Sequence, residues 1–470
     1  MNHPYATSAA LKRPLPEALA ERLRARFGDR FSTALAVREH HGRDESPFPV
    51  TPPDAVVFAE STEDVVEAVL ACREHRFPII PFGTGSSLEG HLLAVHGGLT
   101  IDVSRMNRVL TVAPEDLLCT VQAGVTRKQL NAEIKDTGLF FPIDPGADAS
   151  LGGMTATRAS GTNAVRYGTM RENVLGLTVV TAEGKVVRTG TRARKSSAGY
   201  DLTRLFVGSE GTLGIVTDVT VRIYPVPEAM SAAVCHFPSM ADAVDTVIET
   251  IQLGVPIARC EFVDEVMVRA LNAYSKTTLP EAPTLFFEFH GSEASAREQA
   301  ETVQEVARSY GGKDFQWATQ PEDRTRLWNA RHNAYFAALQ IRPGCRAVTT
   351  DTCVPISRLA ESINGARRIL DRAPCPTAIV GHVGDGNFHA ILLVNPDDPA
   401  EIELAESLND EIVRLAISMG GTCTGEHGIG LHKIGYLVEE AGDDAIELMR
   451  RIKHALDPDG LMNPGKIFRA

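Results

Sequence analysis

The spacing of hydrophobic residues in the first half of the chain predicts helices and strands in alternation. Residues 62–75 carry apolar side chains at helical spacing, with Val65 and Val69 on one face, and predict an amphipathic helix. The apolar run at residues 79–82 predicts a strand. Residues 142–167 show neither period and are rich in Gly, Ala, Ser and Thr. Because long loops inside compact domains usually serve a function, this stretch is a candidate binding loop.

The pattern changes after residues 224–228, whose alternating prolines indicate a domain boundary. A strand, a helix, two strands and a helix follow, an order typical of a ferredoxin-like, split βαβ unit. A second round of elements suggests a structural repeat, although no sequence self-similarity supports it. The elements predicted along the chain are helix 126–136, strand 232–237, a helix capped by Ser239, strands 259–263 and 285–290, a helix capped by Ser295, helix 322–340, strand 348–354, helices 356–371 and 400–419, and a last helix from residue 446.

Two histidines flank the strongest turn signal in the chain. Asp385-Gly386 lies between apolar runs at residues 377–380 and 390–394, which predicts a hairpin with a two-residue turn. With that turn, His382 would face His389 directly, and opposed residues have Cβ atoms about 4.5–5.5 Å apart on one face of the sheet. The alternative is two histidines without a common role.

Glu426 and His427 follow downstream among glycines. Two imidazoles and one carboxylate are enough to bind a divalent metal with an open coordination position. The shared face of the two hairpin histidines, together with this pair, favours a metal site over unrelated histidines. Cys423, three residues before Glu426, is an alternative ligand, but a buried structural thiol is the more common role of such a cysteine.

Composition narrows the functional classes. The 470 residues, 43% of them hydrophobic, are ample for two domains with cores of their own. The 47 basic and 60 acidic residues give a net charge of −13 without a basic stripe, which argues against nucleic acid as a partner. No apolar run approaches the roughly 18 residues of a membrane span, and Met1–Pro14 lacks the apolar core of a secretory signal. The eight cysteines form no CxxC pair, which predicts reduced thiols in a cytoplasm.

Three glycine-rich segments, at residues 83–90, 144–163 and 207–216, could enclose an extended dinucleotide. The first follows a predicted strand, and backbone N–H groups without bulky side chains can hold a pyrophosphate. It is neither a P-loop nor a Rossmann fingerprint. A plain surface turn fits the first segment equally well, and an ordinary glycine-rich α/β domain is the alternative for the three segments together.

These loops, in this order, resemble the FAD-binding domain of the vanillyl-alcohol oxidase/p-cresol methylhydroxylase superfamily. The hairpin motif at 382–389, the Glu-His-Gly-x-Gly stretch at 426–430 and the Asn-Pro-Gly-Lys tail at 463–466 resemble its FAD-linked 2-hydroxyacid dehydrogenase branch. The similarity covers about residues 31–468, and the likeness is greatest to the FAD-dependent D-lactate dehydrogenases of mitochondrial type. Supporting segments are residues 36–39, 41–46, 330–334, 342–345 and 350–359.

The resemblance implies an α+β protein with a two-subdomain FAD-binding domain of the p-cresol methylhydroxylase type. A cap domain with a mainly antiparallel sheet, covered by helices in ferredoxin-like units, would complete it. We expect the FAD-binding domain at residues 1–226, with an N-terminal arm at 1–50. The substrate or cap domain is expected at 227–425, and a C-terminal segment at 426–470 would return to the FAD domain.

The resemblance also assigns the site. Gly83–Ser87 would hold the FAD pyrophosphate, and Gly214–Val216 would approach the adenine half. The metal ligands would be His382, His389 and Glu426, and the base would be His427. The residues expected to contact FAD are Gly83, Thr84, Gly85, Ser86, Ser87, Pro145, Gly146, Ser150, Gly153, Thr157, Gly161, Asn163, Tyr167, Glu210, Gly214, Ile215, Val216 and Asn463.

FAD is expected to be dissociable. Covalent attachment in this superfamily commonly uses a His or Cys in these loops, whereas the pyrophosphate loop here offers Thr84, Ser86 and Ser87. His91 is the nearest exception.

The implied reaction is the oxidation of a D-2-hydroxyacid, with the Cα hydrogen leaving as hydride to flavin N5. A divalent metal (zinc, manganese or iron) would acidify the substrate hydroxyl, and His427 would accept its proton. Arg331 could clamp the substrate carboxylate, with a surface arginine as the alternative, and Tyr335 would limit the pocket from the same helix face.

Other substrates and activities remain open. The family's hydroxyglutarate enzymes carry Thr and Lys where this chain has Tyr335 and Thr349, which favours a monocarboxylate such as D-lactate over 2-hydroxyglutarate. Glycolate is a further alternative. A metallohydrolase that uses the His/His/Glu site would leave the dinucleotide loops unexplained, and a subunit that binds FAD only to pass electrons would not need the ligands and base. We expect a quinone, a cytochrome or an electron-transfer flavoprotein as the acceptor, and a cytoplasmic location, peripheral to the inner membrane at most.

Overall fold

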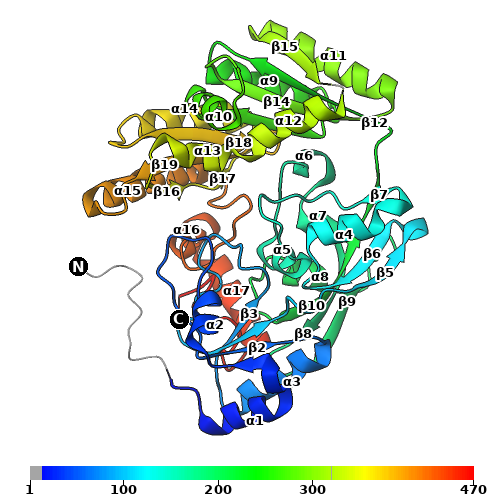
Figure 1. The fold of residues 1–470 in the computed structure, drawn as a ribbon, viewed down its shortest axis with the longest axis vertical. Coiled ribbons are helices and arrows are strands. Elements are labelled where there is room, and N and C mark those ends of the chain that lie inside the picture. The colour runs from blue at the N-terminus through cyan, green and yellow to red at the C-terminus, as the bar shows by residue number, and fades with distance from the viewer. Residues whose placement is uncertain (1–12, 319, 470) are drawn as a thin grey trace. The chain divides into compact units, whose positions relative to one another are not determined.

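A computed structural model describes residues 13–318 and 320–469, and the chain divides into two compact units. Unit 1 holds residues up to 159, 169–225 and from 426 onward, and unit 2 holds residues 160–168 and 226–425 (Figure 1). The short segment 160–168 groups with unit 2, although the sequence assigned it to the FAD-binding domain. The expectation that Met1–Pro14 lacks a secretory signal falls mostly on residues 1–12, which lie outside the described part.

Unit 1 is built on two larger sheets and the two-stranded sheet β7-β11. The first has the strand order β1-β2-β4-β3 with β2, β4 and β3 parallel, and the second has the order β5-β6-β10-β8-β9 with antiparallel pairs. A β2–α3–β3 crossover links the parallel strands, and Ser61 caps α3 by accepting a hydrogen bond from the Asp64 N–H at 3.2 Å. The strands of unit 1 are β1 Phe31–Ser32, β2 Ala55–Phe58, β3 Ile79–Phe82, β4 Leu99–Asp102, β5 Val109–Ala113, β6 Leu118–Gln122, β7 Leu139–Phe140, β8 Val174–Val180, β9 Val186–Gly190, β10 Ile215–Arg222 and β11 Tyr224–Pro225.

The C-terminal segment packs within unit 1 (Figure 1). After α17 the chain runs beside β3, where Met462 and Ile79 form a parallel bridge and the Asn463 N–H donates to the Ile79 carbonyl at 2.8 Å. The helices of unit 1 are α1 Glu17–Phe27, α2 Leu35–His40, α3 Thr62–Glu74, α4 Arg127–Ile134, α5 Leu151–Thr157, α7 Met170–Asn173, α8 Leu202–Phe206, α16 Ile434–Ala441 and α17 Asp443–Leu456.

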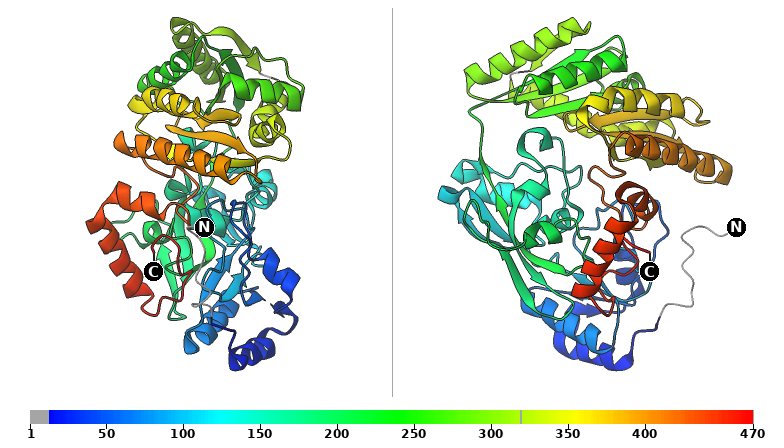
Figure 2. Two further views of the ribbon diagram at one scale, coloured as in Figure 1. Left: turned by 90° about the vertical axis from the view of Figure 1, so that its left-hand side faces the viewer. Right: turned by 180° about the vertical axis from the view of Figure 1, so that it is seen from behind.

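Unit 2 is an antiparallel sheet with helices on both faces (Figure 2). Its strand order is β15-β12-β14-β13-β18-β19-β16, and β17 pairs with β19. Phe287 packs with α9, α11, α14 and α15 on one face, and Phe286 packs with α10, α12 and α13 on the other. The elements of unit 2 are α6 Ala164–Tyr167, β12 Ala229–His236, α9 Met240–Gln252, β13 Arg259–Val263, α10 Glu265–Ser275, β14 Thr284–Gly291, α11 Glu293–Ser309, β15 Lys313–Ala318, α12 Pro321–His332, α13 Ala334–Ile341, β16 Arg346–Thr349, β17 Thr352–Cys353, α14 Leu359–Leu370, β18 Thr377–His382, β19 Asn387–Val394 and α15 Pro399–Ser418.

Several predicted elements are corrected by the structure. The predicted helix 322–340 is two helices: α12 ends at His332, and its cap residue Asn333, whose N–H donates to the carbonyls of Asn329 and Ala330, separates it from α13. The helix expected to be capped by Ser295 begins three residues earlier, with Ser292 as its cap. The glycine-rich stretch 142–167 contains the short helices α5 and α6, and α10, α16 and β15 were not predicted.

The predicted strand 348–354 is interrupted between β16 and β17. The Thr350 hydroxyl accepts the Ala390 N–H at 2.8 Å, and the Thr350 carbonyl accepts from His389 Nδ1 at 3.0 Å. A side chain thus replaces one bond of the sheet ladder, and the freed carbonyl fixes the ring of His389. The departure from regular strand geometry lies beside a predicted metal ligand.

Candidate functional site

The hairpin that carries His382 and His389 has a four-residue loop, residues 383–386, between β18 and β19. In the observed register His382 is opposite Asn387 and Val380 is opposite His389, so the predicted pairing of the two histidines is wrong by two residues. Gly381 is opposite Phe388, and only glycine fits there because a Cβ on residue 381 would lie 2.7 Å from the Phe388 Cβ. Since side chains alternate with a period of two, a two-residue shift leaves both histidines on one face. Their ring centroids lie 5.5 Å apart.

Both histidines use Nδ1 to bind the protein. His389 Nδ1 lies 3.0 Å from the Thr350 carbonyl, and because a carbonyl can only accept, this nitrogen carries the proton. His382 Nδ1 lies 2.8 and 2.9 Å from the two carboxylate oxygens of Glu261. The Nε2 atoms are then the lone-pair donors, which is the usual arrangement of metal-binding histidines. The donor set of this hairpin therefore fits a divalent metal.

Glu261 was not predicted, but its side chain contacts two predicted site residues, His382 and Arg331. Its carboxylate is buried on β13 and also contacts Arg331 NH2 at 2.5 Å. Burial alone would raise the pKa of Glu261, but His382 and Arg331 outweigh burial and lower it. The signal in the sequence was a glutamate between the apolar residues Cys260 and Phe262 of β13.

The expected common face of Arg331 and Tyr335 is not present. Arg331 ends α12 with 7% of its surface exposed, whereas Tyr335 begins α13 and is 47% exposed. The break at Asn333 separates the two helices, so the four-residue spacing no longer places these side chains one above the other. Arg331 Nε is buried and has no hydrogen-bond acceptor among the described residues.

The segment that leads to Glu426 is fastened to the hairpin within unit 2. The Gly425 N–H donates to the Asp351 carbonyl at 3.0 Å, and Asn387 Nδ2 donates to Asp351 Oδ1 at 3.0 Å. A Cβ on Gly425 would lie 2.2 Å from Asn387 Nδ2, so only glycine fits. Glu426 is the next residue and opens the last segment of unit 1, while the alternative ligand Cys423 is fully buried.

Within unit 1, His427 belongs to a cluster around Glu89. The buried Glu89 carboxylate accepts from His427 Nδ1 at 3.1 Å and His432 Nδ1 at 2.9 Å, and pairs with Lys433 Nζ at 2.9 Å. Burial would raise the pKa of Glu89, but Lys433 and the two histidines hold it well below its ordinary value. Glu89 is therefore ionised and orients the predicted base. Sequence analysis missed it, although it lies inside the first glycine-rich loop.

The first two glycine-rich loops meet in unit 1. Gly85 has a φ of +76°, which favours glycine, and a Cβ on Gly83 would lie 2.6 Å from Ser150 Oγ. Ser150 in turn caps α5 by accepting the Gly153 N–H at 3.3 Å, and Thr157 ends that helix. Without side chains at these glycines, the backbone N–H groups of the loop can lie close to an anionic ligand. Pro145 and Gly146 lie in the same connection before α5.

Glu210 of the third loop bonds to residues 429–430 and to Asn463 of the tail. The Glu210 carboxylate accepts the N–H groups of Ile429 at 2.7 Å and Gly430 at 2.8 Å, and lies 3.3 Å from His91 Nε2. Asn463 Nδ2 donates to the Glu210 carbonyl at 2.8 Å. Gly214 precedes β10, whose Ile215 and Val216 are paired with β8, and a Cβ on Gly214 would lie 2.8 Å from the Val180 carbonyl. These contacts hold in place the loop that leads to Gly214–Val216, the residues expected to approach the adenine half of FAD.

Three of the predicted FAD residues, Gly161, Asn163 and Tyr167, lie in unit 2. Asn163 Oδ1 accepts from Arg259 Nε at 2.9 Å, and the Tyr167 hydroxyl lies 2.9 Å from His290 Nδ1. The predicted FAD residues are thus divided between the units, with the remaining ones in unit 1.

Comparisons with known proteins identify the family. Residues 226–467 match the model of the C-terminal domain of FAD-linked oxidases, and residues 53–190 match an FAD-binding domain. The chain belongs to the FAD-linked oxidases. A Danio rerio protein named a probable mitochondrial D-lactate dehydrogenase is 53% identical over 440 residues, which are 93% of this chain and 88% of that protein. An Arabidopsis thaliana protein named a mitochondrial D-lactate dehydrogenase [cytochrome] is 45% identical over 98% of this chain and 82% of its own length.

A solved structure confirms the predicted fold. Substrate-bound p-cresol methylhydroxylase superposes on this FAD-linked oxidase with a TM-score of 0.79, covering 96% of this chain and 97% of the other, at 19% sequence identity. This likeness shows the α+β fold. The two family models and the two relatives show that the chain is a flavoenzyme and that FAD is its cofactor.

The expected cytoplasmic location of the FAD-linked oxidase is wrong. Both relatives described above carry mitochondrial names, and these contradict an assignment that rested only on unpaired cysteines and on the N-terminal sequence. Among the described residues, no helix is long and apolar enough to cross a membrane.

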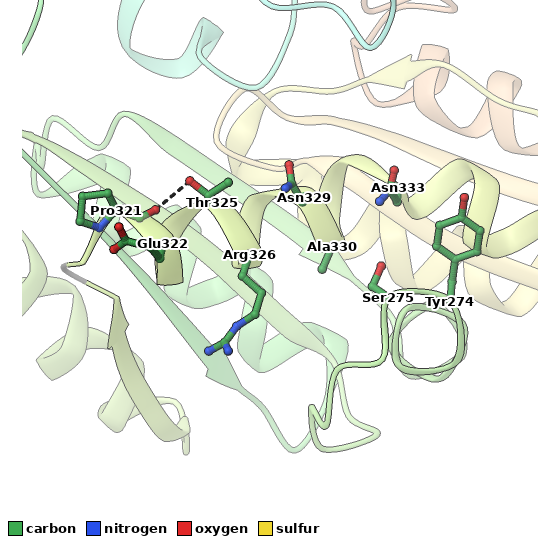
Figure 3. Close-up of a pocket in the computed structure, with 9 residues that line it drawn as sticks. All are labelled: Tyr274, Ser275, Pro321, Glu322, Thr325, Arg326, Asn329, Ala330 and Asn333. Carbon is green, nitrogen blue, oxygen red and sulfur yellow. Dashed lines mark hydrogen bonds between the residues drawn. The ribbon is translucent and has the colours of Figure 1, made fainter.

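A surface pocket of about 610 Å³ lies elsewhere in unit 2, between α10 and α12 (Figure 3). Asn329, Ala330 and Asn333 of α12 and Tyr274 and Ser275 of α10 line it. None of the predicted site residues is among its lining residues.

Proposed function

We propose that this FAD-linked oxidase oxidises D-lactate, or a related D-2-hydroxy monocarboxylate, to the 2-oxoacid. The observation that carries the proposal is the pair of hairpin histidines, whose Nδ1 atoms bind Glu261 and the Thr350 carbonyl, which places the lone pair of each ring on Nε2. The printed names of the two relatives, both D-lactate dehydrogenases, support the substrate class.

The proposed metal ligands are His382, His389 and Glu426. Glu426 is supported by its neighbour Gly425, whose N–H is bonded to Asp351 beside the hairpin. Two imidazoles and a carboxylate suit zinc, manganese or iron. A metallohydrolase could use the same ligands, but it gives no role to the FAD-binding domain.

FAD, when bound, supplies a two-electron acceptor for the Cα hydrogen at N5, and the metal supplies Lewis acidity for the substrate hydroxyl. His427 takes the hydroxyl proton at Nε2, since Glu89 accepts from Nδ1 and holds the ring in that tautomer. Arg331 binds the substrate carboxylate, and its buried Nε is a donor that this carboxylate would satisfy.

The substrate preference is the first prediction. D-Lactate should be oxidised with a kcat/KM at least about a hundredfold above that of D-2-hydroxyglutarate, because a second carboxylate left desolvated and unpaired costs several kcal/mol. Tyr335 and Thr349, at the positions where the family's hydroxyglutarate enzymes carry Thr and Lys, offer no cation. Handedness is inferred from family resemblance.

The rates of flavin reduction by D-lactate, L-lactate, D-2-hydroxybutyrate, glycolate and D-2-hydroxyglutarate test both the preference for a monocarboxylate and the handedness. Faster reduction by the dicarboxylate or by glycolate would reassign the substrate. Faster reduction by L-lactate would overturn the handedness.

The second prediction is that FAD is bound without a covalent link. The loop Gly83–Ser87 contains neither His nor Cys, and His91 is buried beside Glu210. Acid precipitation should release the yellow chromophore into the supernatant, and flavin that stays with the pellet would contradict this.

The proposed electron acceptor is a quinone, a cytochrome or an electron-transfer flavoprotein. A cytochrome is the acceptor in the name of the Arabidopsis relative. Reoxidation of the reduced protein by cytochrome c, a soluble quinone and an electron-transfer flavoprotein in parallel would distinguish them.

A further inference from the structure

A buried carboxylate in unit 2 touches two residues with different proposed tasks. Glu261 is completely buried, and its oxygens lie 2.8 and 2.9 Å from His382 Nδ1 and 2.5 Å from Arg331 NH2. His382 is a proposed metal ligand, and Arg331 is proposed to bind the substrate carboxylate. The same side chain thus joins the two parts of the site that lie in this unit.

The register of the sheet places Glu261 next to His382. β13 pairs with β18 so that Phe262 is opposite Gly381, and the next position along the ladder places Glu261 beside His382. Directly opposed residues in antiparallel strands share a face and lie within side-chain reach. Since a buried carboxylate must be paired, the two partners of Glu261 also account for its presence in an apolar strand.

We propose that Glu261 is a positioning residue that couples metal binding to substrate binding. It fixes His382 with Nδ1 protonated and Nε2 directed away from the carboxylate, and it holds the guanidinium of Arg331 with Nε left as a donor. The inference rests on the proposed function, because it takes His382 as a metal ligand and Arg331 as the carboxylate clamp. Carboxylates that orient metal-binding histidines commonly change metal affinity when they are replaced.

The chain offers a matched control on the adjacent strand β14. Glu288 is also a buried carboxylate, with His290 Nε2 at 2.8 Å and Arg259 Nε at 3.6 Å. It therefore has the same kind of partners as Glu261 but contacts neither His382 nor Arg331. Damage caused merely by removing a buried charge from this sheet should appear in both variants.

The test measures zinc affinity of the FAD-loaded protein by competition with a chromophoric chelator. Glu261→Gln should weaken zinc binding by about 10- to 100-fold, whereas Glu288→Gln should bind zinc as the unmodified protein does. Arg331→Lys should raise KM while leaving zinc affinity unchanged, because it keeps a cation beside Glu261. With zinc at saturation, Glu261→Gln should still show a raised KM, since the partner of Arg331 has lost its charge.

The outcomes separate this inference from the proposed function. If the unmodified protein binds no zinc, manganese or iron, the metal site and this inference both fail. If it binds metal and Glu261→Gln binds it equally well, or if Glu288→Gln loses as much affinity, only the role of Glu261 is overturned. Melting temperature and FAD content report folding. If Glu261→Gln does not fold, Glu261→Asp, which keeps the charge on a shorter side chain, should show weaker zinc binding, and unchanged binding would overturn the inference.

Discussion

Treatment of the purified FAD-linked oxidase with a metal chelator is expected to abolish turnover while FAD stays bound. The proposed Lewis acid is lost, and an alcohol without one keeps a pKa far above neutral; a bound metal can lower the pKa of water from about 16 to about 7. The flavin should stay because the loop Gly83–Ser87, which is expected to hold its pyrophosphate, contains none of the proposed metal ligands. Dye reduction measures turnover, and absorbance near the flavin maximum measures retained FAD.

Two variants sharpen this experiment. His389→Ala removes a proposed donor and should reproduce the effect of the chelator, with metal content falling in parallel. Cys423→Ala is the matched control, because this buried thiol is the alternative ligand that the sequence leaves open. Full activity in protein shown to be free of metal would remove the metal from the mechanism, and loss of metal from Cys423→Ala would revise the ligand set.

Local signals in the sequence predicted elements well where a cap or a clean period was present. The strand at residues 79–82 agrees with β3, and Ser239 caps α9 as expected. The predictions failed where a regular element is interrupted locally. The Thr350 hydroxyl interrupts a strand and Asn333 ends a helix, and neither event changes the hydrophobic period that the predictions used.

The hairpin shows which errors in a predicted strand register would separate the residues of a site. The turn was predicted with two residues and has four, yet His382 and His389 still share a face because the register moved by an even number. A shift by one residue would have sent one of these rings to the other face. Motif spacing could therefore identify the candidate ligands without the correct turn.

The positioning carboxylates could not be predicted from the sequence. Glu261 is 121 residues from His382, and Glu89 is 338 residues from His427. Neither glutamate belongs to a spacing motif with its partner, because each contact is made by tertiary packing. The remaining hint was a charged residue in an apolar or glycine-rich setting, which marks a buried partner without naming it.

His427→Ala is expected to slow flavin reduction by about 10²–10⁴-fold, the usual cost of losing a general base. The protein should keep its FAD, since His427 is outside the glycine-rich loops, and its metal, since the proposed ligands are retained. Glu89 would still be paired with His432 and Lys433, so its buried charge remains balanced. The single-turnover rate of flavin reduction by D-lactate, measured by stopped flow, reports the effect without a contribution from the electron acceptor.

His432→Ala is the matched control for this prediction. His432 donates to the same carboxylate at 2.9 Å, so its removal disturbs the Glu89 cluster to a similar degree. If proton transfer belongs to His427, the His432 variant should reduce its flavin close to the rate of the unmodified protein. If the two variants are equally slow, the cluster acts only as structural support. If His427→Ala reduces its flavin at full speed, the base must be sought elsewhere, because Glu89 would then orient a ring that takes no proton.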